Sequence, residues 1–394
     1  MTKALADGAV GGGCAESVQG ENAGMKQVSV VQVGLGTVGG VLLEQMLDQH
    51  DRWAQDFGLD IRIMAVAGRG GAVVGATDCD GALRPLTTEA VHALVEGRRS
   101  KLTLGAPTVP LADAIVRIAA TGPTIVVDAA SGEQTADALL AALDAGAGAV
   151  LSNKAPLALP ADDPRSARLW DAARAGTLRY EATCGAGLPV ISTLTGLLAS
   201  GDRVLDVTGC LSGTLGAIFS MVAAGESFSD AVREAKAKGY TEPDPRDDLS
   251  GLDVARKALI LARTMGLPLD LADIAIHSLV PPQLESVSVD EFLAQVGIED
   301  AEITASARQA QADGAALKYV AQVAPAAQPV ATVGLQELPR TTMLGALQGP
   351  ENVVSFRTER YDAYPLVVSG PGAGAAVTAA GMAVDLLALA GQIG

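Results

Sequence analysis

The sequence predicts an α/β protein with two domains, a doubly wound parallel sheet followed by an α+β domain with a mixed sheet. Two observations carry this prediction. The chain has 394 residues, more than the ~250–300 of a usual single core. Strand and helix patterns alternate at first, and β-rich runs without strict alternation follow. We expect residues 26–158 with 366–394 to form the first domain, residues 159–365 the second, and residues 1–25 a disordered arm.

Composition excludes several classes of protein. The net charge of −17 argues against a nucleic-acid partner, because binding to phosphates needs clustered Lys and Arg. We see no apolar run of the ~18–20 residues that cross a bilayer, so we expect no membrane partner. The four cysteines form no C-x-x-C pair and have no histidine at ligand spacing. This pattern predicts neither a zinc site nor a disulfide framework and fits a reducing cytoplasm.

The first β-rich run, VSVVQV, is followed by a glycine turn and an apolar-periodic helix. The turn matches G-x-G-x-x-G at Gly34, Gly36 and Gly39, which after a buried strand is typical of dinucleotide binding. Gly34 permits the tight turn, Gly36 lets the backbone approach the pyrophosphate, and Gly39 lets the helix pack on the strand. Thr37 and Val38 then supply helix N-terminal amides to the phosphates. The first domain is therefore expected to be Rossmann-type and to bind a dinucleotide.

The second strand, IRIMAVAGR, decides which dinucleotide we expect. Its end carries no acidic residue for the ribose hydroxyls of NAD. Arg69 stands there instead, and a guanidinium pairs with a 2′-phosphate. The sequence therefore favours NADP, with NAD as the alternative; an ordinary surface arginine is the other reading of Arg69.

Two further strands end in polar residues. One ends at Asp128 and is followed by Ser131, and the next ends at Ser152-Asn153-Lys154. Because ligands of doubly wound sheets bind at the carboxyl ends of the strands, Ser131 and Lys154 are candidates for cofactor contact.

The runs VLDVTGC, LKYVAQV, PVATVGL and NVVSFRTER predict the mixed sheet of the second domain. The chain then closes with a strand, a glycine turn and a helix over residues 364–391. We expect this terminal element to return to the first domain and to place Gly372 and Gly374 near the cofactor.

An acidic stretch, GYTEPDPRDDLSGLDVARKALILAR, lies in the second domain. Its two prolines predict that TEPDPRDD is not helical. Asp253 and Lys257 stand four residues apart on the helix that follows, so their side chains meet on one face. A capping box from Ser250 to Asp253, a surface ion pair and a solvated charge run are the alternative readings of this stretch. Capping of the helix by Asp253 and stabilisation of its dipole by Asp247 and Asp248 do not account for Lys257, whereas the surface ion pair stays open as an alternative.

The acidic stretch closely resembles the signature of the homoserine dehydrogenases. The segments YEATCGAGLPVISTL, GCLSGTLGAIFS, SNKAPLA and GPGAGAAVTAAGMAVD are also similar to that family. The resemblance runs from about Val28 to the end of the sequence. It implies an oxidoreductase that interconverts L-aspartate 4-semialdehyde and L-homoserine with NAD(P)H, in the pathway to threonine, methionine and isoleucine. It also implies a cytoplasmic homodimer.

The resemblance also implies roles for particular residues. Glu242 and Asp248 match positions that bind the substrate's amino group, Asp253 and Lys257 match the acid/base pair beside the reacting oxygen, and Lys154 matches a catalytic lysine between cofactor and substrate. A loop that holds a monovalent cation such as Na⁺ through backbone carbonyls is matched by Glu181, Cys184, Ala186 and Leu188. Cys184 departs from the family pattern, although carbonyl ligation does not depend on the side chain.

Two further expectations concern regulation and the alternatives. We expect a monofunctional enzyme without a C-terminal regulatory ACT module, on which threonine acts at most as a competitor of homoserine. An NADP-binding oxidoreductase of another small semialdehyde and a non-catalytic nucleotide sensor stay open as alternatives. The sensor has no need of Lys257. A phosphorylating semialdehyde dehydrogenase needs a cysteine nucleophile with a histidine base, and neither Cys184 nor Cys210 shows that signal.

Overall fold

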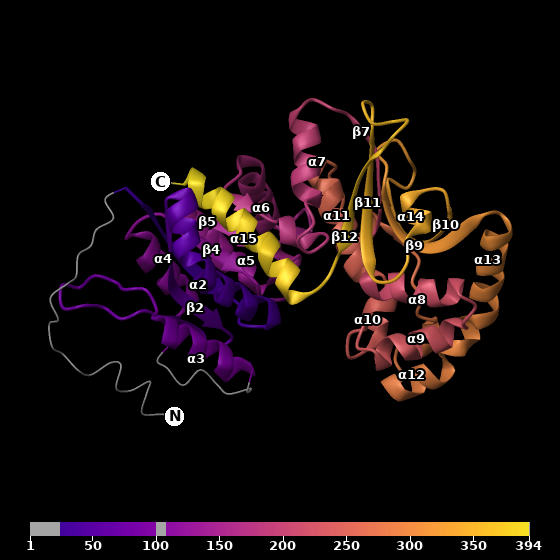
Figure 1. Cartoon of the computed structure of the whole chain (residues 1–394), viewed down its shortest axis with the longest axis horizontal. Coiled ribbons are helices and arrows are strands. Elements are labelled where there is room, and N and C mark those ends of the chain that lie inside the picture. The colour runs from indigo at the N-terminus through magenta and orange to yellow at the C-terminus, as the bar shows by residue number, and fades with distance from the viewer. Residues whose placement is uncertain (1–23, 100–107, 394) are drawn as a thin grey trace. The chain divides into compact units, whose positions relative to one another are not determined.

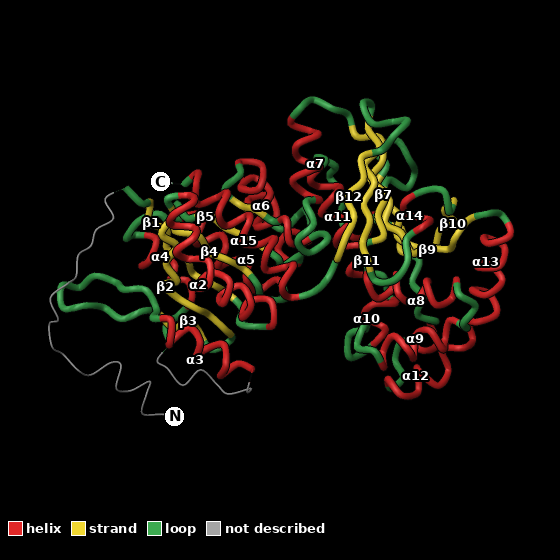
Figure 2. The backbone as a smooth tube through the Cα atoms, viewed as in Figure 1, coloured by secondary structure: helices red, strands yellow, loops and turns green. Residues whose placement is uncertain are grey.

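The computed structural model describes residues 24–99 and 108–393. The predicted disordered arm lies, apart from its last two residues, outside the described residues. The chain divides into two compact units, Met1–Thr183 with Gly374–Gly394, and Cys184–Ala373. Figure 2 shows helices on either side of the strands within each unit.

The first unit contains a six-stranded sheet in the order β3-β2-β1-β4-β5-β6. All neighbours are parallel except β3, which pairs antiparallel with β2. The predicted doubly wound sheet is therefore confirmed, with an antiparallel edge strand that the sequence did not predict. The strands are β1 (Lys26–Val33), β2 (Leu59–Gly68), β3 (Gly71–Val74), β4 (Thr124–Asp128), β5 (Gly148–Leu151) and β6 (Leu178–Arg179).

Helices cover both faces of this sheet (Figure 1). One face packs against α2, α3 and α15, whose apolar side chains form one core cluster with those of β1 and β2. Helices α4 and α5 contact the central strands, and α6 packs beside α5. The helices of this unit are α2 (Thr37–Phe57), α3 (Thr88–Arg99), α4 (Leu111–Ala119), α5 (Ala136–Asp144), α6 (Pro164–Ala175) and α15 (Ala375–Gln392), with 3₁₀ turns η1 (Glu133–Thr135), η2 (Ala155–Ala158) and η3 (Glu181–Thr183).

The expectation that no apolar run reaches spanning length is wrong for helix α15, the one helix among the described residues that is long and apolar enough to cross a membrane. It packs on α2, β4 and β5, and Leu386 and Met382 are fully buried in the shared core. It also carries the buried Asp385, which accepts a hydrogen bond from the Glu181 backbone N–H at 2.8 Å. The apolar composition of α15 is accounted for by this packing.

The second unit contains a mixed six-stranded sheet in the order β12-β11-β7-β9-β10-β8, as the sequence predicted. Its neighbours are antiparallel except β8, which is parallel to β10. The strands are β7 (Val204–Cys210), β8 (Ala275–Ile276), β9 (Ala315–Val323), β10 (Ala331–Pro339), β11 (Glu351–Thr358) and β12 (Leu366–Pro371).

Helices α8, α11 and α13 pack on the strands of the second unit, and α9 packs on α8 through the ring pair Phe219–Phe228. Buried apolar residues of α14 face β7, β9 and β11. The helices of this unit are α7 (Val190–Ala199), α8 (Gly213–Ala223), α9 (Phe228–Ala237), α10 (Pro245–Leu249), α11 (Leu252–Thr264), α12 (Val289–Gln295), α13 (Asp300–Ala312) and α14 (Met343–Ala346), with η4 (Leu271–Asp273), η5 (Pro282–Leu284) and η6 (Val296–Glu299).

The two units divide at later residues than we expected. Residues 159–183 were expected in the second domain, but β6 pairs with β5 and extends the first sheet to residue 179. Residues 366–373 were expected in the first domain, but β12 pairs with β11 along its whole length. Strand pairing decides both boundaries. The hydrophobic pattern and composition of the sequence do not show which sheet a short strand joins.

Candidate active site

The glycine turn of the first unit has the geometry that a pyrophosphate requires. Gly34 has φ +96°, and a Cβ at Gly34 would lie 2.5 Å from the Ala130 nitrogen. A Cβ at Gly39 would lie 2.2 Å from the Gly34 oxygen, whereas a Cβ at Gly36 would meet no atom within 4 Å. Gly34 and Gly39 are thus required by packing. Gly36 leaves open space in front of the backbone, which fits a bound phosphate group.

Helix α2 begins directly after this turn. Gly36 is its N-cap and makes no side-chain cap bond, and the first turn of the helix contains no acidic residue. The first amides of a helix have no partner within the helix, so those of Thr37, Val38 and Gly39 are available to an anion. The residues present therefore fit a dinucleotide.

The side chain of Gln32 supports the glycine turn through hydrogen bonds, a role that we did not predict. Its side chain is fully buried, and Nε2 donates to the carbonyl oxygens of Gly39 at 2.7 Å and Gly34 at 3.2 Å. The available signal was a single amide in the apolar strand β1. Gln32 fixes both ends of the turn with one side chain.

Arg69 lies in the two-residue turn between β2 and β3, where Gly68 pairs with Gly71. The residue is exposed. Because β2 runs parallel to β1, the turn lies at the same edge of the sheet as Gly34. A guanidinium at this place is available for a 2′-phosphate.

A buried network joins the ends of β4 and β5. Asp128 is fully buried and accepts hydrogen bonds from Thr135 Oγ1 at 2.6 Å, the Ala130 N–H at 3.0 Å and Asn153 Nδ2 at 3.1 Å. Asn153 also donates to the Gly132 oxygen at 2.7 Å. Burial raises the pKa of the Asp128 carboxyl, against the three hydrogen bonds, which lower it.

This network positions two predicted cofactor residues. Ser131 is exposed in the loop between Ala130 and Gly132, whose backbone groups are held by Asp128 and Asn153. Lys154 is half-buried, follows Asn153 directly and caps η2. We did not predict the positioning role of Asp128 and Asn153, because their partners are separated from them by loops in the sequence.

In the second unit, the side chain of Lys257 is buried and held by two oxygen atoms. It lies on α11 and is buried, with 9% of its surface exposed. Its Nζ donates to the Leu211 oxygen at 2.7 Å and pairs with Asp253 Oδ2 at 2.8 Å. The Asp253 side chain is 47% exposed, so this pair has one buried and one open member. Cys184 Sγ donates to the carbonyl oxygen of Lys257 at 3.7 Å.

Asp253 belongs to a group of three carboxylates that interact with one another, Glu242, Asp248 and Asp253, and we call them the acidic cluster. Asp248 Oδ2 accepts a hydrogen bond from the Glu242 backbone N–H at 2.8 Å. Burial raises the pKa of Asp248, and the charges of Glu242 and Asp253 raise it further, against hydrogen bonds from Glu242 and Thr214. The cluster thus holds more negative charge than Lys257 neutralises, an arrangement suited to a second cation.

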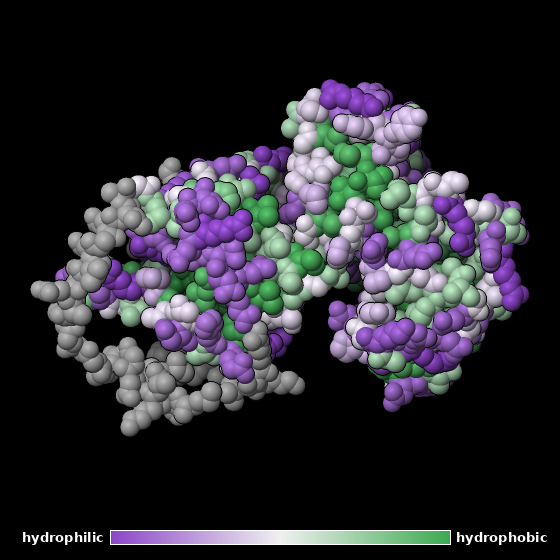
Figure 3. Space-filling view, in the orientation of Figure 1, coloured by the Kyte–Doolittle hydropathy of each residue, from purple (hydrophilic) through white to green (hydrophobic). Residues whose placement is uncertain are grey.

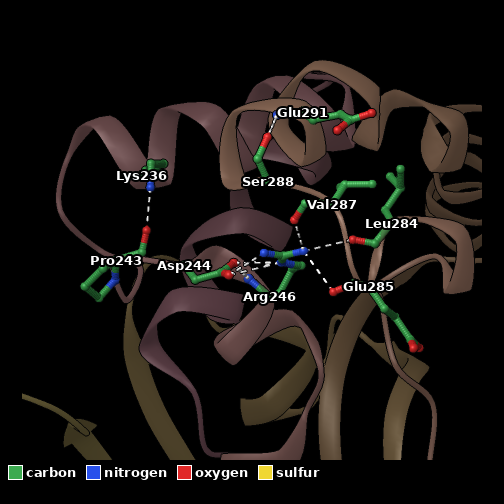
Figure 4. Close-up of polar contacts among 9 residues, drawn as sticks. All are labelled: Lys236, Pro243, Asp244, Arg246, Leu284, Glu285, Val287, Ser288 and Glu291. Carbon is green, nitrogen blue, oxygen red and sulfur yellow. Dashed lines mark hydrogen bonds and ion pairs between the residues drawn. The ribbon is translucent and has the colours of Figure 1, made fainter.

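Asp244, in the same stretch, has a structural role (Figure 4). It caps α10 and pairs with Arg246 Nη2 at 2.6 Å, and Arg246 Nη1 donates to the carbonyl oxygens of Leu284, Glu285 and Val287 at 2.8–3.0 Å. Arg246 holds the pKa of Asp244 below its usual range. This pair ties the acidic stretch to the loop before α12.

One expectation and one alternative reading of this stretch are wrong. Residues 245–249 form α10, because a proline is tolerated at the first helical position and Asp244 caps the turn. The capping box from Ser250 to Asp253 does not form, since the N-cap of α11 is Gly251 with φ +73°. Asp253 pairs with Lys257 instead.

The predicted cation loop continues from the buried η3 into a turn. Glu181 is buried and its backbone N–H is held by Asp385. Cys184 and Ala186 are buried, Gly185 and Ala186 have φ of +83° and +56°, and the Leu188 N–H donates to the Gly185 oxygen at 3.0 Å. Ala186 is the one described non-glycine residue with positive φ. Such a backbone outlier is held by its surroundings and is found at binding sites.

The two glycines of the last turn belong to different units. Gly372 lies in the second unit, directly on Asn352. Gly374 lies in the first unit, where it is the N-cap of α15 with φ +117°.

The fold and the glycine turn define a class, the proteins with a Rossmann-type dinucleotide-binding domain. Residues 34–182 match the family model "Homoserine dehydrogenase, NAD binding domain", and residues 189–387 match the model "Homoserine dehydrogenase". The homoserine dehydrogenase of Saccharomyces cerevisiae is 34% identical over 93% of this chain and 99% of its own length. The chain belongs to the homoserine dehydrogenase family.

Two further relatives show the extent of the similarity. A bifunctional aspartokinase/homoserine dehydrogenase of Arabidopsis thaliana is 38% identical over 92% of this chain, which spans 38% of that protein's length. A hyperthermophilic archaeal homoserine dehydrogenase, solved in complex with NADPH, shares the fold with a TM-score of 0.67 at 22% identity, over 92% of this chain and 97% of that one.

Proposed function

We propose that this protein catalyses the NAD(P)-dependent interconversion of L-aspartate 4-semialdehyde and L-homoserine. The observation that carries the proposal is the buried Lys257 ammonium, which bonds the Leu211 oxygen and pairs with Asp253, a carboxylate that interacts in turn with Asp248 of the acidic cluster. A lysine in this position serves a reaction that needs a proton at an oxygen atom. The carboxylates serve a substrate that carries an ammonium group.

Reduction of the aldehyde requires a hydride at carbon and a proton at oxygen. The nicotinamide cofactor, when bound, supplies the hydride. Lys257 donates the proton to the carbonyl oxygen and stabilises the negative charge that develops there. Asp253, paired with Nζ at 2.8 Å, orients the ammonium and restores its proton from solvent, to which it is open. Homoserine oxidation reverses each of these steps.

The acidic cluster orients the substrate. Glu242 and Asp248 bind the α-ammonium, and Asp248 is suited to this because burial strengthens its interaction with a cation. Lys154, at the end of β5, addresses the substrate carboxylate or the reacting oxygen. Gly34, Gly36, Gly39 and their helix hold the pyrophosphate, to which Ser131, Gly372 and Gly374 add contacts.

Two finer assignments follow from the same residues. Arg69 selects NADP through the 2′-phosphate, because no carboxylate ends β2. Backbone carbonyls of Glu181, Cys184, Ala186 and Leu188 hold a monovalent cation such as Na⁺, for which the buried turn with positive φ at Ala186 is the support.

Assembly and location belong to this proposal too. We expect a cytoplasmic homodimer. Figure 3 shows hydrophobic residues gathered over the part of the second unit where Figure 1 places β7, β11 and β12. Leu366, Val367 and Val368 of the edge strand β12 are half-buried there, as expected of strands that pack against a second copy.

The test uses the purified full chain and NADPH oxidation followed at 340 nm. L-aspartate 4-semialdehyde is compared with succinate semialdehyde, which lacks the ammonium group. We expect turnover of the first and a kcat/KM for the second that is lower by roughly 10²-fold or more, because the acidic cluster then faces a substrate without a cation. No turnover of aspartate semialdehyde, or equal turnover of the two, would contradict the proposal.

A further inference from the structure

Asn352 on β11 is buried without a partner for its side chain. Its exposed surface is 0%, and neither Nδ2 nor Oδ1 has a hydrogen-bond partner among the described residues. A carboxamide offers two donors and an acceptor, and an unsatisfied buried polar group costs about 1–3 kcal/mol. Such a group in a folded protein requires an explanation.

The residue packs directly on the last crossing between the two units. A Cβ at Gly372 would lie 1.9 Å from both Cγ and Nδ2 of Asn352, so the backbone of Gly372 rests on the carboxamide. We call residues 370–374 the glycine segment. Gly370 and Gly374 have φ of +151° and +117°, so the segment uses backbone conformations that side-chain-bearing residues rarely adopt.

Asn352 also lies beside the strand end that anchors Lys257. In the antiparallel ladder of β11 and β7, Val353 pairs with Cys210. Cys210 is the last residue of β7 and directly precedes Leu211, and on the other side Asn352 pairs with Gly370 of β12. The carbonyl oxygen of Leu211 accepts the hydrogen bond from Lys257 Nζ. The carboxamide thus contacts the glycine segment, and the next residue on the same strand, Val353, pairs with the strand end that leads to Leu211.

The glycine segment is joined to the cofactor-binding unit by the chain itself. Gly374 caps α15, and α15 packs on α2, the helix that begins at the pyrophosphate turn. Gly372 is therefore two residues from the start of the helix that packs on α2.

We propose that Asn352 is a positioning residue for the reaction proposed above, on which this inference rests. In the enzyme with its dinucleotide bound, the carboxamide hydrogen-bonds to peptide groups of the glycine segment. These bonds fix the segment against the end of β7 and thereby hold Leu211 and Lys257 in place.

The experiment compares the wild type with Asn352→Leu, which keeps the size and removes the polar atoms. Three quantities are measured: the Tm of the unliganded full chain, the rise in Tm with saturating NADPH together with the Kd for NADPH, and kcat with L-homoserine. We expect an unchanged or higher unliganded Tm, a smaller rise with NADPH, a Kd higher by about 3–10-fold and a kcat lower by roughly 10–100-fold.

Thr358→Val is the matched control on the same strand. Thr358 is also fully buried, but its hydroxyl already bonds Asp202 Oδ2 at 2.7 Å. We expect it to lower the unliganded Tm and to leave the NADPH-dependent rise unchanged. Asn352→Ser, which fits the same space, is a second variant at this position. It must show the same pattern of Tm, Kd and kcat as Asn352→Leu.

Two results would overturn the inference. A Leu variant that is as active as the wild type, with an unchanged Kd for NADPH, shows that the amide has no role. A Leu or Ser variant that behaves like Thr358→Val, or that fails to fold, shows a purely structural role. An inactive wild type refutes the proposed function instead, whereas the NADPH-binding measurements do not depend on the substrate.

Discussion

Replacing Lys257 by methionine removes the proposed proton donor while it keeps the length and apolar stem of the side chain. A positioned acid or base contributes about 10²–10⁴-fold to the rate. This factor corresponds to roughly 3–5 kcal/mol of transition-state stabilisation. We therefore expect kcat for homoserine oxidation to fall by about 10²–10⁴-fold.

The structure also sets the expected cost in stability. The substitution leaves the Leu211 oxygen without its donor at 2.7 Å, which costs about 1–3 kcal/mol if no water reaches it. Asp253 loses its partner, but its side chain is 47% exposed and is solvated. Burial of an ammonium is no longer required, which offsets part of the loss. The variant should fold, with a modestly lower Tm.

The assay is NADP⁺ reduction at 340 nm, with the Kd for NADPH measured separately by fluorescence. Lys238→Met is the control, because Lys238 is exposed and pairs with Glu234 at 2.5 Å on the neighbouring helix α9. It should leave kcat unchanged. If Lys257→Met folds, binds NADPH normally and keeps a kcat within a few-fold of the wild type, Lys257 is not the proton donor.

Further predictions address the cofactor, the substrate and the fold. Arg69→Ala should raise KM for NADPH far more than KM for NADH, and an equal effect on both would exclude Arg69 as the selector. Because its pKa is raised, Asp248 becomes neutral at a higher pH than an ordinary aspartate. KM for homoserine should therefore rise as pH falls through the pKa of Asp248. The variant Asp248→Asn should show a high KM that does not depend on pH in this range. Asp244→Ala should lower the free energy of unfolding by about 1–3 kcal/mol, measured in urea at pH 7. Its lowered pKa means that the wild-type advantage is present at neutral pH and is lost as pH falls through the pKa of Asp244. Gly39→Ala should prevent NADPH binding or folding, since its Cβ would lie 2.2 Å from a backbone oxygen; normal NADPH affinity would show that the turn can move.

The fold class could be predicted because its signals are local. The buried strand before Gly34, the glycine turn and the amphipathic helix are contiguous, and each has its own period or turn chemistry. The short strands β3, β6 and β8 gave no such signal. Their two to four residues are defined by partners such as β2, β5 and β10, which the sequence does not show to be adjacent.

The candidate site was predictable to a different degree in its two parts. Lys257 and Asp253 are four residues apart on one helix, so their contact follows from helical geometry. The other partner of Lys257, the Leu211 oxygen, is 46 residues away in the sequence. This contact depends on where β7 ends relative to α11, which the sequence does not show. The same holds for Gln32 and Asn352, polar residues in apolar strands whose meaning depends on the loop that packs on them.

The acidic stretch shows why residue type alone does not assign a role. Asp244 and Asp248 are four residues apart and are the same amino acid, yet their environments shift their pKa values in opposite directions. Arg246 lowers the pKa of Asp244, and its guanidinium is in turn held by three carbonyl groups, so this carboxylate is neutralised and structural. Burial beside Glu242 and Asp253 raises the pKa of Asp248, so this carboxylate carries an uncompensated interaction with any cation that enters. The charge of Asp244 is neutralised by the arginine that holds the loop, whereas the charge of Asp248 is available for the ammonium group of a substrate.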